Sequence, residues 1–63
     1  MNKQTVFYLE LTAEKQAYEE MIESSKKDAK DNPSFAGFFI SQVSMYEAKL
    51  EVVNEIIYKY LRS

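Results

Sequence analysis

Apolar residues in the second half of the chain recur with a helical spacing. Their intervals alternate between four and three residues: Phe39, Val43, Tyr46, Leu50, Val53, Ile57 and Tyr60. This is the heptad pattern of a helix that packs along one seam against another helix. Asn32 suits the cap before such a helix and Pro33 suits its first position, with Ser34 as an alternative cap. The pattern predicts a helix over about residues 33–61.

The first half of the chain carries a helical pattern that leaves one alternative open. One face of a helix over about residues 3–30 would hold Phe7, Leu11, Tyr18, Ile22 and Ala29, with Met21 beside them. Residues 4–11, however, are rich in strand formers. Thr12 could then cap a helix that begins at Ala13. The N-terminal segment is therefore either the start of one long helix or a separate strand.

The leading prediction is an all-α fold, an antiparallel two-helix hairpin that forms a single domain over residues 1–63. The two helices have nearly equal lengths and meet at a turn over residues 31–33. Folding the chain there matches apolar positions on the two helices, as a helical hairpin requires, and sets Phe7 near Tyr58 at the open end.

The second helix has more apolar surface than one hairpin can cover. A further line of large apolar residues runs about 130° around the helix from the seam; it comprises Phe35, Phe38, Met45, Val52 and Ile56. Soluble monomers rarely leave such a patch exposed. We therefore expect a homodimer, a four-helix bundle with this line of residues at or near the dimer interface.

Composition narrows the possible chemistry. The chain has 63 residues and contains neither cysteine nor histidine, so disulfides, thiolate metal sites and the commonest general base are excluded. We expect no catalytic residues, no cofactor and no metal site. A domain of this size usually needs a disulfide, a metal ion or a partner subunit to stabilise it. Without cysteine or histidine, a partner subunit is the stabilising element that we expect. Gly37, the single glycine, falls near the start of the second helix, where a small residue lets another helix approach closely.

Charge is informative about partners. Glu47, Glu51 and Glu55 lie one helical turn apart and form an acidic stripe. The stripe is either a solvated face, with Glu55 and Lys59 as an ion pair, or a surface that engages a basic groove of another protein. The net charge of −2 and the pI of about 5.0 do not point to nucleic acid or to an anionic membrane as a partner. The apolar run at residues 6–9 is too short for a signal peptide, so we expect a cytoplasmic protein.

The strand alternative resembles a known family. An alternating segment over residues 5–11, the helix start at Thr12, and Ser34-Phe35 at the opening of the second helix resemble the ribbon-helix-helix DNA-binding family. This resemblance implies a strand-helix-helix dimer whose ribbon reads the major groove. The outward residues of the ribbon would here be Val6, Tyr8 and Glu10, whereas the family usually has polar or basic residues there.

Together these patterns predict a small non-catalytic protein–protein interaction module. It would act as a homodimer and be regulatory or inhibitory toward a protein partner. The alternative is a nucleic-acid-binding regulator with a ribbon-helix-helix-like architecture.

Overall fold

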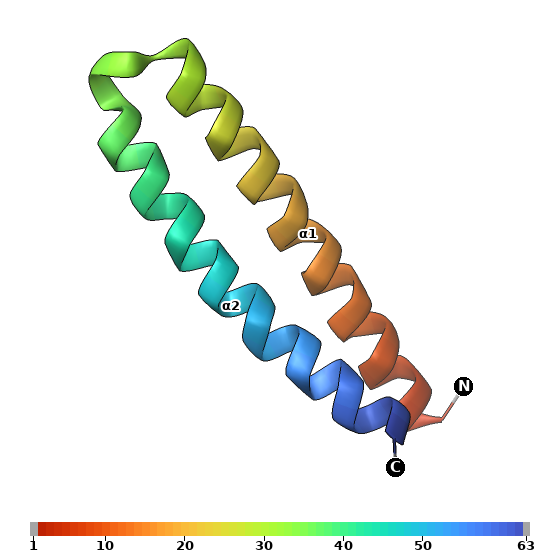
Figure 1. The fold of residues 1–63 in the computed structure, drawn as a ribbon. Coiled ribbons are helices and arrows are strands. Elements are labelled where there is room, and N and C mark those ends of the chain that lie inside the picture. The colour runs from red at the N-terminus through yellow and green to blue at the C-terminus, as the bar shows by residue number, and fades with distance from the viewer. Residues whose placement is uncertain (1, 63) are drawn as a thin grey trace.

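The computed structural model describes residues 2–62 and shows two antiparallel helices joined by a short connection (Figure 1). Helix α1 spans Lys3–Asp31, the 3-10 helix η1 spans Pro33–Phe35, and helix α2 spans Ala36–Arg62. The predicted all-α hairpin is confirmed, and residues 2–62 contain no strand. Positions 1 and 63 of the predicted single domain lie outside the described residues. Neither long helix has the continuous apolar stretch needed to cross a membrane, within the described part of the chain.

The N-terminal segment is the beginning of α1, so the strand alternative for residues 4–11 is wrong. Asn2 caps the helix: its side-chain oxygen accepts hydrogen bonds from the Thr5 backbone N–H at 2.8 Å and from the Thr5 hydroxyl at 2.9 Å. The Thr12 hydroxyl donates to the Tyr8 carbonyl at 2.9 Å inside the helix. Thr12 is therefore bonded within a continuous helix and does not begin a new one.

Asn32 ends α1 and also occupies the N-cap position of η1. Its backbone N–H and its side-chain amide both donate to the Asp28 carbonyl, at 2.9 and 3.2 Å. Its side chain makes no capping bond to η1. The predicted N-cap position is therefore confirmed, but the side chain caps the end of α1 instead, because it points back toward the unpaired carbonyls there. Pro33 does occupy the first position of η1, as expected.

The core is one seam between the two helices. Leu11, Ile22, Val43 and Val53 are the buried apolar residues. The other members of the predicted α2 seam, Phe39, Tyr46, Leu50, Ile57 and Tyr60, are half-buried. The α1 seam alternates three- and four-residue intervals in the same way, through Tyr8, Leu11, Lys15, Tyr18, Ile22, Ser25 and Ala29, all buried or half-buried. The heptad prediction for α2 is therefore confirmed.

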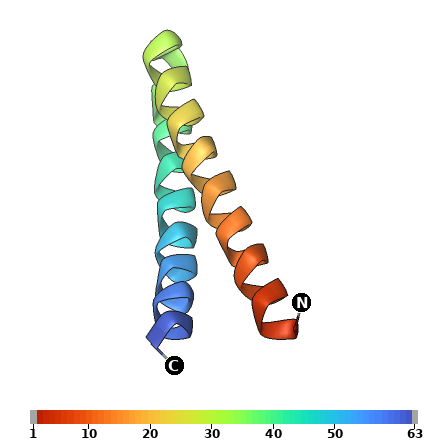
Figure 2. The ribbon, with the colours of Figure 1, turned by 90° about the vertical axis from the view of Figure 1, so that its right-hand side faces the viewer.

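The two helices diverge toward the chain termini, as Figure 2 shows. Tyrosine pairs lie along the seam: the ring centroids of Tyr18 and Tyr46 are 6.1 Å apart, and those of Tyr8 and Tyr60 are 5.3 Å apart nearer the open end. The predicted proximity of Phe7 to Tyr58 is wrong. Both side chains are about half exposed, and Tyr8 and Tyr60 turn inward in their place.

Candidate protein-binding face

The predicted line of apolar residues on α2 lies outside the core. Phe35 and Phe38 are more than 60% exposed, Val52 is 56% exposed, and Met45 and Ile56 are 44% and 38% exposed. The hairpin therefore leaves all five large side chains in contact with solvent, as the sequence pattern predicts for residues that the partner helix cannot reach.

Helix α1 extends this surface. Phe7 and Met21 are 48% and 43% exposed, and each immediately precedes a residue of the α1 seam. Along α2, Phe38, Met45, Val52 and Ile56 likewise each immediately precede a seam residue, whereas the exposed Ile40 follows one. A residue one position earlier lies about 100° around the helix, always in the same rotational sense.

This shared position places these six residues of the two helices on one side of the hairpin. Seen from one end of the hairpin, one step back along the chain turns clockwise on one helix and counter-clockwise on the other, because the helices are antiparallel. The two seams also face each other, so they point in opposite directions. The rows that precede the two seams therefore emerge on the same side. We call this surface the apolar face and define it by its large side chains: Phe7, Met21, Phe38, Met45, Val52 and Ile56, with Phe35 at its connecting-turn end.

The opposite side of the hairpin has a different composition. The residues that immediately follow the two seams are mostly polar or charged: Leu9, Thr12, Gln16, Glu19, Glu23, Lys26 and Lys30 on α1, and Ile40, Ser44, Glu47, Glu51, Asn54, Tyr58 and Leu61 on α2. Of the 14 residues that immediately precede the two seams, seven are apolar and seven, including Glu14 and Lys49, are polar or charged. The hairpin is thus two-sided, with more apolar residues on one side than on the other.

Phe38 joins the apolar face to the core. Its ring meets the ring of Phe39 edge to face, with centroids 5.5 Å apart and an interplanar angle of 70°. This is a favourable geometry for two aromatic rings. Because Phe39 is half-buried in the seam, the exposed face continues directly into the hydrophobic interior.

The total exposed area is large for a chain of this mass. The isolated hairpin exposes 5014 Å², whereas a compact monomer of 7.4 kDa exposes about 4200 Å². The excess of about 800 Å² is close to the area that each partner buries in a standard protein–protein interface.

The predicted acidic residues, Glu47, Glu51 and Glu55, are all exposed. Glu55 forms the expected ion pair with Lys59, with an N–O distance of 3.4 Å. Both side chains are more than 60% exposed, so the pair contributes little to folding stability. Residues 2–62 hold no group of three carboxylates close enough to bind a metal ion.

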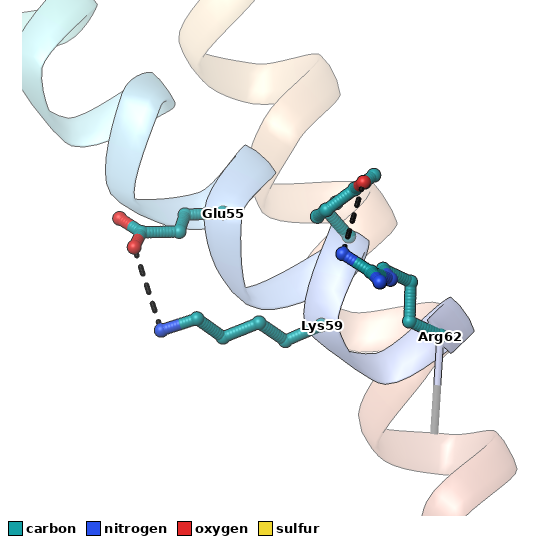
Figure 3. A pocket seen from close by; sticks show the side chains of 4 residues that line it. Glu55, Lys59 and Arg62 are labelled. Atoms are coloured by element: carbon teal, nitrogen blue, oxygen red, sulfur yellow. Dashed lines mark hydrogen bonds and ion pairs between the residues drawn. The ribbon is translucent and has the colours of Figure 1, made fainter.

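A shallow depression of about 550 Å³ lies near the C-terminal end of α2 (Figure 3). It is lined by Glu55, Tyr58, Lys59 and Arg62. The Arg62 guanidinium donates to the Tyr58 hydroxyl at 3.3 Å and lies over the Tyr58 ring at 5.3 Å from its centroid. All four residues belong to one helix, so the depression has a single wall and does not enclose a ligand.

Sequence reasoning missed the contribution of α1 to the apolar face. Phe7 was placed in the core, and Met21 only beside it. The missing signal was the two polar residues of the α1 seam, Lys15 and Ser25. Including them gives the full three-four alternation and places Phe7 and Met21 beside the seam. The Tyr58–Arg62 contact was also missed, although the four-residue spacing is visible in the sequence.

Comparison of this chain with protein-family models, with curated proteins and with solved structures finds no match. Function is therefore inferred from the chemistry of the apolar face.

Proposed function

We propose that this protein is a non-catalytic protein–protein interaction module that acts as a homodimer and regulates or inhibits another protein. In the dimer, two hairpins form a four-helix bundle with their apolar faces together. The observation that carries the proposal is the exposure of the whole α2 line, from Phe35 to Ile56, on the isolated hairpin. Exposed apolar side chains gathered on one side of a small protein are typical of interaction sites.

The core of the isolated hairpin is small. Four apolar residues among the described positions 2–62 are buried, and each large side chain moved out of water contributes about 1.5–3 kcal/mol. Covering several residues of the apolar face adds buried apolar surface to that of the seam. Association then stabilises the fold, as is usual for domains of this length without disulfides.

Analytical ultracentrifugation of the wild type and of Met45→Glu tests the homodimer. We expect a dimer at micromolar concentration for the wild type and a monomer for Met45→Glu, because a buried carboxylate at the centre of the face has no partner charge. Ser44→Glu is the matched control, since it adds the same charge to the adjacent, exposed position on the other side of α2. A monomeric wild type, or equal dissociation of both variants, contradicts the proposal.

The regulated protein would meet the side of the dimer that stays open to solvent. Glu47 and Glu51 lie on that side, and their charge suits a basic protein surface. Capture from the host lysate with the wild type should recover a protein that is released as the salt concentration rises. The double variant Glu47→Lys/Glu51→Lys should remain a dimer but should not retain that protein. Equal retention by both proteins contradicts an acidic contact.

A further inference from the structure

We infer that the two hairpins of the dimer align with their connecting turns at the same end, so that α1 of each copy lies against α2 of the other. Glu14 and Lys49 of both copies then form one layer of alternating charges across the interface. This inference rests on the proposed homodimer and specifies which surfaces of the second copy it buries.

The first step is that both charges belong to the apolar face. Glu14 immediately precedes Lys15 of the α1 seam, and Lys49 immediately precedes Leu50 of the α2 seam. They therefore emerge on the same side as Met21 and Met45. Both are exposed on the isolated hairpin, and a second copy seated on the apolar face would cover them.

The second step is that the two charges lie at the same level along the hairpin. The ring contacts fix the register, because Tyr8 meets Tyr60 and Tyr18 meets Tyr46. Glu14 lies between the two tyrosines of α1, and Lys49 lies between those of α2. Interpolation puts them within about one helical turn, or about 5 Å along the axis.

Two symmetric arrangements can join the apolar faces of two copies. With the connecting turns at opposite ends, α1 lies against α1 of the second copy and α2 lies against α2 of the second copy. This brings Glu14 toward Glu14 and Lys49 toward Lys49. With the turns at the same end, α1 of each copy lies against α2 of the other copy. Glu14 and Lys49 then alternate around the four helices. Like charges held together in an interface disfavour a pairing, and opposite charges favour it.

Such a charge layer determines the orientation of the two hairpins more than it strengthens the binding between them. Covering charges costs solvation, which their mutual attraction roughly offsets, and the best-attested role of buried polar groups is to fix register and orientation. The surrounding apolar residues, among them Phe7, Met21 and Ile56, supply contacts that either orientation could use. The charge layer is the feature that distinguishes the two orientations.

A charge-reversal pair tests whether the charged residues meet across the dimer. We expect Glu14→Lys and Lys49→Glu each to weaken self-association by about tenfold or more, because each variant places four like charges in one layer of its homodimer. Mixing the two variants should restore association as a heterodimer, a gain that misfolding cannot produce. Glu19→Lys is the matched control, since it makes the same change on the other side of α1. Wild-type affinity of each variant alone, or no gain on mixing, overturns the charge layer.

A distance measurement tests the orientation directly. The chain has no cysteine, so Ser34→Cys carries a single spin label at the exposed connecting turn. With the turns at the same end, label-to-label distances in the dimer should fall below about 30 Å, since neighbouring helices are about 10 Å apart. With opposite ends, the distance approaches the 48 Å length of the hairpin.

The outcomes separate this inference from the proposed function. A wild type that stays monomeric contradicts the homodimer itself. A dimer that Met45→Glu dissociates, but whose labels lie near 48 Å apart, overturns the orientation and leaves the interaction module standing.

Discussion

The rings of Tyr8 and Tyr60 stack across the open end of the hairpin, with centroids 5.3 Å apart and an interplanar angle of 17°. The helices are farther apart here than near the connecting turn (Figure 2). Aliphatic side chains such as Leu11 and Val53 fill the seam farther in, whereas the wider gap takes two large rings. The pair therefore ties the first turns of α1 to the last turns of α2.

Removing one of these rings should loosen the open end. We expect Tyr8→Ala to lower the free energy of unfolding by about 1–3 kcal/mol, through lost ring packing and lost burial. Urea unfolding followed by circular dichroism at a fixed protein concentration measures the change. Tyr8→Phe keeps the ring and should retain most of the stability. Equal losses for the two variants would assign the effect to the hydroxyl group instead of the stack.

The hairpin could be predicted because the α2 seam is apolar at every position, from Phe39 to Tyr60. The α1 seam was harder to recognise. Lys15 and Ser25 interrupt its apolar pattern, and the neighbouring Phe7 competes with Tyr8 for the inward position. Hydrophobicity alone favours Phe7. The structure selects Tyr8 because it continues the three-four alternation that leads to Leu11.

Ser25 is the most buried polar residue of the hairpin, with 3% of its surface exposed. It occupies a seam position next to Ile22, so little space remains for a larger side chain. We expect Ser25→Leu to destabilise the hairpin by about 1–3 kcal/mol through overpacking. Ser25→Ala, which fits the same space, should leave thermal unfolding nearly unchanged. A Leu variant more stable than the wild type would reveal unfilled volume at this position.

The candidate site was partly predictable for a similar reason. Phe38, Met45 and Val52 recur at seven-residue intervals on a helix whose seam was already assigned, so their exposure could be expected from the sequence. The α1 contribution depended on knowing which residues face inward. The level of Glu14 relative to Lys49 required the observed tyrosine contacts, because sequence spacing alone does not fix the register of two helices.

Asn2 was not recognised as a helix cap, yet its side-chain oxygen accepts from both the backbone N–H and the hydroxyl of Thr5. We expect Asn2→Ala to cost about 0.5–2 kcal/mol and to fray the first turn of α1. Amide hydrogen exchange should show faster exchange at Thr5, with little change in α2. Asn2→Asp keeps the acceptor and adds a negative charge at the helix N-terminus, so it should protect this turn at least as well.

Gly37 lies in the first turn of α2 with ordinary helical backbone, and a Cβ atom added there would meet nothing within 4 Å. The close helix approach expected from the sequence is therefore absent within the hairpin. We expect Gly37→Ala to raise the free energy of unfolding by about 0.5–1 kcal/mol, because alanine loses less backbone entropy on folding. The residue lies away from the apolar face, so the dissociation constant of the dimer, measured by ultracentrifugation, should not change. Weaker association in Gly37→Ala would instead place a partner helix against this position.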